Sequence, residues 1–332
     1  MDNAMDRLSP YADGYERFFT AEIEPSLAEM EKKRREVARK IKRSLVLALV
    51  AFVLFLACLV PPWFGAAFSA GMEPYRGGGM MAGLFVSAVF LFRAGYLTIG
   101  VQGDFKEVVV GRTCTFLGLD YARSSSDFPV DRFRETGLCS GFDDSTIEDA
   151  ISGEHKGVAL QLCQASLERR GGSSDSGSST STAFKGVLLI YRFPKRFHGA
   201  TVVLPDATWA GNLVVGLRQE GQRVTLEDVG FEDRFEVYSS DQVEARYLLT
   251  PRFMERVVAL GRMFDEDGGG LSMAFDGSDL LIAYRTPLKL FVGAGVFTDF
   301  TDRAHIGPIL KELAMLLEIV DVLKLDDRSG SA

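Results

Sequence analysis

A run of seventeen residues without a charge, 44–60, constrains this chain more than any other feature. It reads SLVLALVAFVLFLACLV, and a helix of that length covers about 25 Å, most of a ~30 Å hydrocarbon core. Pro61 and Pro62 then end the helix, and Trp63 suits the interface between lipid and water. We therefore expect a membrane span at about 44–63.

A second apolar segment follows at 80–99. The sequence MMAGLFVSAVFLF reaches residue 92, Arg93 interrupts it, and residues 94–99 extend it. Because Arg93 lies toward the end of the segment, its guanidinium can reach the lipid headgroups. We expect a second span here, so that residues 44–100 form a transmembrane hairpin; a buried or re-entrant helix is the alternative.

Basic residues predict the orientation of this hairpin. The segment from Lys32 to Arg43 contains eight lysines and arginines, whereas the loop 61–79 contains Arg76 alone. Positively charged residues stay on the cytoplasmic side, so both termini are expected in the cytoplasm and the protein in the cytoplasmic membrane. The same basic segment is expected to bind anionic headgroups, by roughly 1 kcal/mol for each basic residue.

Residues 1–43 are expected to form an N-terminal cytoplasmic helical segment. Apolar residues recur at three- and four-residue steps from Tyr15 to Ile41, although Pro25 punctuates the run. Arg34 stands where this stripe should continue, which disfavours a coiled coil. We expect the stripe to pack on the protein's own domain; pairing with another copy and lying on the bilayer are the alternatives.

The charge of the remaining chain argues against nucleic acid as a partner. Residues 101–332 carry 25 basic and 35 acidic side chains, a net charge of −10, and this repels phosphate backbones. The mean hydropathy of the whole chain is +0.08, and 47% of its residues are hydrophobic. These values fit a minority of membrane sequence joined to a soluble majority.

Residues 101–332 are expected to fold into a cytoplasmic α+β domain with a mainly antiparallel sheet. Alternating apolar residues and aromatic or β-branched runs predict strands at 158–168, 184–193, 200–204 and 235–238. Helical spacing and capping residues predict helices at 105–119, 146–151, 241–249, from Pro251 to a turn at 265–270, and 307–324.

Two loop signals complete this domain. The stretch 171–182, GGSSDSGSSTST, cannot support a packed core, so we expect a mobile loop that joins two antiparallel strands. The four residues from Asp276 to Asp279 separate two apolar runs, 271–275 and 280–285, and predict a hairpin.

No motif predicts a catalytic residue, a cofactor or a metal. The sequence lacks HExxH, GxSxG and a phosphate-binding glycine loop between a strand and a helix. A zinc site assembled from His and Cys across the fold, and a Ser/His/Asp triad assembled in space, stay open as alternatives. The cysteines, which are widely separated, are expected to be reduced: Cys58, Cys114, Cys139 and Cys163.

Four residues are candidates for an interaction site. Lys195, Arg196 and His198 form a local basic patch within PKRFHG, which suits headgroups or an acidic partner. The alternative for these three is a solvated hairpin end. Arg246 stands among apolar helix neighbours, and a structural ion pair with Asp241 or Glu244 is the leading interpretation.

Four stretches of the chain are familiar in combination. They are GYERFFTAEIEPSLAEMEKKRREVARKIK, STIEDAISGEHKGVALQLCQASLE, FKGVLLIYRFPKRFHGATVVLPD and VTLEDVGFEDRFEVYSSDQVEARYLLTPRFMERVVAL. With the two spans they cover most of residues 14–290, and the chain resembles the bacterial family known as domain of unknown function 3137. The resemblance implies a bacterial membrane protein with this arrangement and no known reaction or ligand.

The signature residues of this resemblance look structural, at turns, caps and strand positions. They are Asp149, Gly153, Gly157, Phe184, Gly186, Phe197, Gly199, Pro205, Asp241, Ala245, Arg246, Leu249, Thr250 and Pro251.

The leading hypothesis is a membrane-anchored, non-catalytic binding or scaffold module in the bacterial inner membrane. Its expected partners are the lipid bilayer and an unidentified protein. Two alternatives stay open: a membrane-tethered hydrolase whose site the sequence does not reveal, and a subunit of an oligomeric channel or transport complex. The second alternative would make the chain a homo-oligomer, because two spans cannot enclose a pore.

Overall fold

The computed structural model describes residues 14–59, 76–171, 180–205, 221–264, 270–287 and 289–324. They belong to two compact units. One unit contains Glu16–Val109 with Gly293–Pro308, and it is mainly helical. The other contains Val110–Val292 with Ile309–Ala332 and the first fifteen residues, and it holds the sheet. Each unit is described by itself below.

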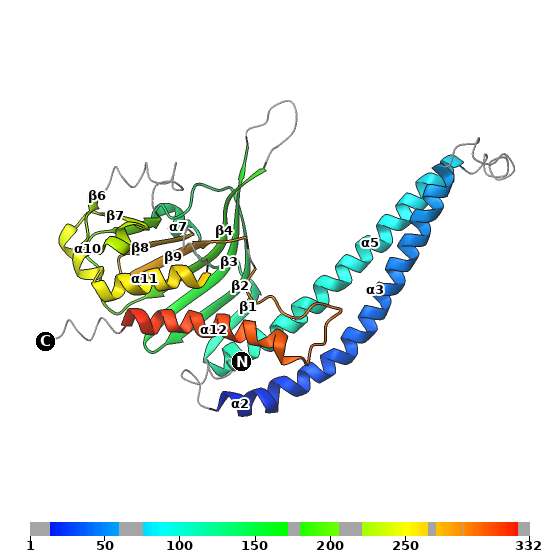
Figure 1. Cartoon of the computed structure of the whole chain (residues 1–332), viewed down its shortest axis with the longest axis horizontal. Helices are drawn as coiled ribbons and strands as arrows, with labels where there is room; N and C mark the ends of the chain where they lie inside the picture. The colour runs from blue at the N-terminus through cyan, green and yellow to red at the C-terminus, as the bar shows by residue number, and fades with distance from the viewer. Residues whose placement is uncertain are drawn as a thin grey trace. The chain divides into compact units, whose positions relative to one another are not determined.

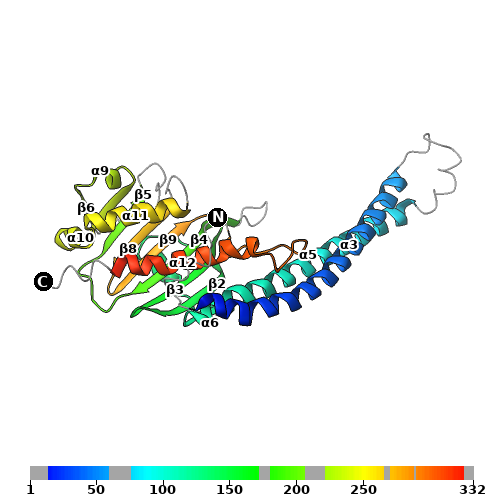
Figure 2. The same ribbon diagram turned by 60° about the horizontal axis from the view of Figure 1, so that its bottom comes forward.

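The helical unit is built on two long antiparallel helices that lie side by side (Figures 1 and 2). Its helices are α2 (Tyr15–Phe18), the π-helical turn η1 (Phe19–Ile23), α3 (Glu24–Leu59) and α5 (Arg76–Lys106). Gly83 of α5 lies directly on α3: a Cβ added at Gly83 would be 3.0 Å from the carbonyl oxygen of Ala51. A glycine is needed there because the two backbones come so close.

The N-terminal helical segment and the first apolar run form one helix, α3. Pro25 does not end the helix, although η1 runs into α3 without a break and Pro25 therefore lies inside a continuous helical stretch. The π-helical turn just before Pro25 marks where the hydrogen-bond pattern changes around the proline, which lacks an N–H.

The other unit contains a sheet whose nine strands, among the residues described, are all antiparallel to their neighbours. The spatial order is β1-β2-β3-β4-β9-β8-β5-β7-β6. The strands are β1 (Leu119–Ser124), β2 (Asp144–His155), β3 (Val158–Arg170), β4 (Thr180–Arg192), β5 (Thr201–Pro205), β6 (Gln222–Val224), β7 (Phe235–Ser239), β8 (Leu271–Asp276) and β9 (Asp279–Arg285).

Helices pack on both faces of this sheet. On one face, Phe133 of α7 (Asp131–Glu135) joins a core with Phe184, Leu188 and Leu281. The other face is covered by α11 (Pro251–Phe264) and by α12 (Arg303–Lys324) from Ile309 onward (Figure 1). The rings of Phe253 and Phe275 lie 5.8 Å apart on that face. The shorter helices are η4 (Glu107–Gly111), α6 (Arg112–Phe116), α9 (Val229–Glu232) and α10 (Gln242–Leu248).

The predicted α+β class with an antiparallel sheet is confirmed. The strands predicted from the apolar runs correspond to β3, β4, β5 and β7, and the hairpin around Asp276–Asp279 joins β8 to β9. The helices predicted from 241 and from Pro251 both begin with a side-chain cap. The carboxylate of Asp241 accepts hydrogen bonds from the N–H groups of Val243 and Glu244, and the Thr250 hydroxyl accepts one from Phe253 N–H.

The predicted helix at 146–151 is wrong, because these residues lie in β2. Asp149 there has a positive φ of 51° in a bulge between Glu148 and Ile151, and its carboxylate accepts a 2.7 Å hydrogen bond from the Tyr121 hydroxyl. Pairing with strands on both sides outweighed the local helix signal.

Two further differences concern a strand that was not predicted and the position at which another strand begins. Strand β1 was not predicted from the sequence, and β4 begins at Thr180, inside the predicted loop 171–182. Most of that loop lies outside the described residues, as do Trp63 and the loop 61–75.

Candidate functional site

The structure brings the predicted interaction residues onto one loop and one helix. Lys195, Arg196 and His198 lie between β4 and β5, and Arg246 lies on α10. The Lys195 amino group is 5.5 Å from the centre of the Tyr247 ring, and His198 N–H donates a 3.4 Å hydrogen bond to a Glu244 carboxylate oxygen. The loop therefore packs on α10, and we call Lys195, Arg196, His198 and Arg246 together the basic patch.

Exposed apolar side chains accompany the basic patch. Val243 is 78% exposed and Tyr247 is 57% exposed, and their spacing of four residues places them on one face of α10. Arg196, His198 and Arg246 are exposed as well. Cations beside an exposed aromatic ring are typical of surfaces that bind proteins.

Among the described residues, Arg246 forms no ion pair with either of the two carboxylates named as its candidate partners. Asp241 caps α10, and Glu244 accepts the hydrogen bond from His198. Arg246 itself faces solvent.

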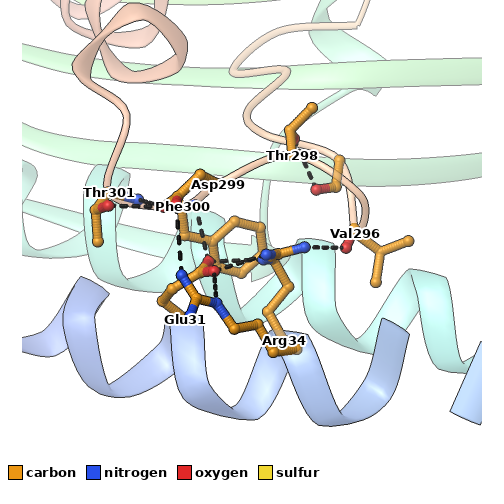
Figure 3. Close-up of polar contacts among 9 residues, drawn as sticks. Glu31, Arg34, Val296, Thr298, Asp299, Phe300 and Thr301 are labelled. Carbon is orange, nitrogen blue, oxygen red and sulfur yellow. Dashed lines mark hydrogen bonds and ion pairs between the residues drawn. The ribbon is translucent and has the colours of Figure 1, made fainter. Parts of the chain in front are cut away.

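A second polar cluster, in the helical unit, was not predicted. Arg34 donates two 2.6 Å hydrogen bonds to the carboxylate of Glu31, and a third, of 2.7 Å, to the carbonyl oxygen of Val296 (Figure 3). The same Glu31 carboxylate accepts a 3.1 Å hydrogen bond from Phe300 N–H. We call Glu31 and Arg34 the clamp, because they attach α3 to the chain segment 296–300.

The clamp is shielded from water. The side chains of Arg34 and Glu31 are 11% and 8% exposed. The Phe300 ring lies 4.7 Å from the Phe105 ring of α5, and the Arg34 guanidinium lies 5.9 Å from the Phe300 ring centre. Arg35 also donates to Glu31, at 2.7 Å, but its side chain is 65% exposed. A buried charge pair of this kind depends on both partners being present.

Part of the clamp has a signal in the sequence. Glu31 and Arg34 are three residues apart, the spacing of side chains that meet on a helix, and Arg34 interrupts an apolar stripe. The partner residue Val296 lies 262 positions beyond Arg34 in the chain, so its position could not be inferred from spacing.

The clamp should lose stability in acid. The hydrogen bond from Arg34 is the main reason that the pKa of Glu31 falls from 4.5 to about 2, with a further contribution from Phe300 N–H. Because the folded pKa lies below the unfolded value, the stabilisation is complete above pH 4.5 and is lost as the pH falls toward 2. The shift corresponds to about 3 kcal/mol.

This pH dependence can be measured by hydrogen exchange of residues 296–301, corrected for the intrinsic exchange rate. The useful range is about pH 5 to pH 2.5, over which the stabilisation from the ionised Glu31 carboxylate declines. The opening free energy of the segment should fall with pH in the wild type. Glu31→Gln should show a smaller change over the same range, and what remains belongs to Asp299, whose pKa is lowered by the hydrogen bonds from Thr301. An equal pH response in both proteins would contradict the assignment.

The long helices α3 and α5 bury small residues and expose large apolar ones. Within the two apolar runs, the buried residues are small: Ser44, Ala48 and Ala51 on α3, and Ser87 and Ala94 on α5. Large apolar residues there are exposed instead, including Leu49 (62%), Leu54 (59%), Phe85 (70%) and Phe92 (78%). Within the described ranges, one helical stretch, Met81–Phe116, is long and apolar enough to cross a membrane.

The cysteines that the structure describes are buried thiols. Burial raises the pKa of Cys114 and of Cys139 to about 12, and raises that of Cys163 well above its ordinary value. These thiols are therefore protonated at neutral pH and poor nucleophiles. No group of three or more His, Cys, Asp or Glu side chains in the described part of the chain is placed to hold a metal ion.

Comparison with known proteins gives two matches. Residues 182–325 match the family described as "Protein of unknown function (DUF3137)", which confirms the predicted family resemblance over that range. The crystal structure of the mycobacterial trehalose monomycolate transport factor A, TtfA, shares 13% sequence identity, with a TM-score of 0.35. That alignment covers 67% of this chain and 95% of the other. No curated protein matches the chain.

Proposed function

We propose that the chain is a bacterial inner-membrane protein with a hairpin of two spans, which holds the sheet unit in the cytoplasm as a non-catalytic binding or scaffold module. The observation that carries this proposal is the distribution of side chains on α3 and α5: small residues between the helices and large apolar residues outside. The spans are about 44–63 and 80–99.

The hydrophobic effect explains why this distribution favours lipid. In water, two helices would bury their large apolar residues against each other, at roughly 25 cal/mol for each Å² removed from water. In a bilayer the hydrocarbon chains solvate such residues, and the helices approach through small residues instead. Gly83 against the backbone of Ala51 is a close approach of this kind.

The orientation is supported by exposed cations beside the first apolar run. Arg39, Lys40, Lys42 and Arg43 are exposed on α3, directly before Ser44. Lysine and arginine next to a span remain on the cytoplasmic side. By this rule both termini and the sheet unit lie in the cytoplasm.

Extraction of cell membranes with alkaline carbonate tests the anchor. The full chain should remain in the membrane pellet and require detergent for release. Leu49→Arg with Phe85→Arg places one charge on each outward apolar face, where an arginine costs about 2.5–3.5 kcal/mol at the centre of a span. This double variant should appear largely in the soluble or degraded fraction.

The matched control is Val243→Arg with Tyr247→Arg, which changes two similarly exposed apolar residues on α10. The control should stay in the membrane pellet like the wild type. Release of the unchanged chain by carbonate without detergent would refute the anchor. Reporter fusions at both termini and within 61–79 then test the orientation.

The binding role is supported by the basic patch, where cations lie beside the exposed Val243 and Tyr247 on an otherwise acidic domain. A photoreactive residue at position 243 should form a discrete protein adduct in native membranes. Arg196→Glu with Arg246→Glu should lower the adduct yield on the order of tenfold, because charge reversal slows association and opposes an acidic partner.

Lys185→Glu with Lys311→Glu serves as the matched control, since it changes the net charge equally at two exposed lysines outside the basic patch. The control should leave the adduct yield unchanged. Adducts with lipid and with the chain itself alone would contradict a protein-binding role.

A further inference from the structure

We propose that the segment Gly293–Thr298 is a second membrane contact, in which Phe297 lies in the headgroup layer beside the start of the hairpin. This inference rests on the proposed spans and adds to them a lipid-binding loop from a distant part of the sequence.

The packing of Val296 indicates the depth at which this segment lies along the hairpin, relative to the proposed membrane. Its side chain is 3% exposed and packs with Ile41 of α3 and Ala94 of α5. Ile41 precedes Ser44 by one turn or less, about 4.5 Å along the axis. Ala94 adjoins Arg93, the charge that interrupts the second apolar segment. Each headgroup layer is roughly 5–7 Å thick, so Val296 lies at the depth of the headgroups.

The next residue presents an aromatic ring to solvent at this level. Phe297 is 57% exposed, although the residues on either side of it are buried or partly buried. Tyr96 of α5 is 72% exposed two residues from Ala94, so a second ring lies at a similar depth. Aromatic rings at the interface, beside Lys42 and Arg43, match the pattern that anchors spans in anionic membranes.

The clamp holds the segment in place. Arg34 binds the carbonyl oxygen of Val296, and Glu31 binds Phe300 N–H, on the two sides of Phe297 (Figure 3). A turn between them is closed by Thr298, whose N–H and hydroxyl donate to the Gly295 carbonyl oxygen at 3.0 and 2.8 Å. Phe297 is therefore exposed on a segment that is already ordered. Contact with lipid then requires no further loss of backbone entropy in this segment.

Lipid fits this surface better than a protein does. A specific protein interface buries about 1,000 Å² or more, which a single exposed ring cannot supply. A ring in the headgroup layer needs no such area, because it extends the apolar surface that α3 and α5 already present. The exposed basic residues of α3 at the same level attract anionic headgroups.

Tryptophan fluorescence in nanodiscs of mixed zwitterionic and anionic lipid tests this inference. The full chain carries Trp63 and Trp209, and both are replaced by Phe to give a silent background. Phe297→Trp then reports on the segment, Phe85→Trp on the outward face of α5, and Tyr247→Trp on α10. Each reporter is measured in lipid brominated near the glycerol or near the chain end.

The Phe297→Trp reporter should lose fluorescence in the shallow-brominated lipid, with a smaller loss in the deep-brominated lipid and a spectrum shifted to the blue. The Phe85→Trp reporter should be quenched by brominated lipid, and the Tyr247→Trp reporter should not be quenched. An unquenched reporter at position 297 together with a quenched one at position 85 would overturn this inference and leave the spans intact. An unquenched reporter at position 85 would overturn the proposed spans, and this inference with them.

Discussion

Arg34→Met is expected to release the segment 296–300 from α3 and to lower the opening free energy of that segment by about 3–5 kcal/mol. The substitution keeps an extended side chain and removes its charge and donors. Glu31, with 8% exposure, loses both hydrogen bonds from Arg34 and keeps those from the exposed Arg35 and from Phe300 N–H, and the Val296 carbonyl loses its 2.7 Å hydrogen bond. The penalty arises chiefly from the buried charge that remains.

Arg35→Met is the matched control for this variant. Arg35 is adjacent on the same helix and donates to the same Glu31 carboxylate, but its side chain is 65% exposed. Exposed ion pairs contribute about 0–1 kcal/mol, so this variant should change the opening free energy little.

Hydrogen exchange of residues 296–301 in detergent or nanodiscs separates the two variants. Equal acceleration of exchange by Arg34→Met and Arg35→Met would contradict the inference that the clamp is strong because Arg34 and Glu31 are buried. Exchange in the sheet unit, compared in the same experiment, shows whether the change is confined to the helical unit.

Gly186→Ala is expected to destabilise the sheet unit by about 4 kcal/mol or more, above the roughly 1–3 kcal/mol that overpacking of a core typically costs. Gly186 lies in β4 between Ala165 of β3 and Arg285 of β9. A Cβ at this position would overlap the Tyr284 carbonyl oxygen and would lie 2.9 Å from the Arg285 Cα. These contacts are to backbone, so two central strands would have to move apart.

Gly141→Ala is the control for Gly186→Ala. A Cβ there meets only the end of the Arg169 side chain, at 3.2 Å, and that side chain can move. The expected change is within about 1 kcal/mol. Stability can be followed with a thiol-reactive dye once Cys58, Cys114 and Cys139 are replaced by Ala, because Cys163 is fully buried in β3 and then reacts only when the sheet opens. Equal midpoints for the two variants would contradict the predicted clash.

Much of the sheet unit could be predicted from short-range patterns. Strands β3, β4, β5 and β7 follow apolar alternation and β-branched runs, and the Asp276–Asp279 turn marks the β8–β9 hairpin. The caps at Asp241 and Thr250 could be predicted because a cap involves residues at most three positions apart.

The order of the strands could not be predicted, and neither could the strand nature of residues 146–151. Acidic residues after Thr146 favour a helix start locally, but β1 and β3 pair with this segment on both sides. The number of hydrogen bonds and buried side chains gained in that pairing outweighs a propensity of a few tenths of a kcal/mol per residue.

For the candidate sites, the sequence revealed individual residues, and their grouping required the fold. It singled out Lys195, Arg196, His198 and Arg246, but the loop and α10 meet only because β5 lies beside β7 in the sheet. It marked Arg34 as a charge in an apolar stripe without indicating its role.

The apolar runs and the cations beside them follow from the sequence alone, because the transfer of a helix into lipid depends on local composition. The clamp and the packing of Val296 between α3 and α5 depend on residues some 200–270 positions apart. Contacts over such distances are decided by packing and burial in the folded chain, and no local pattern encodes them.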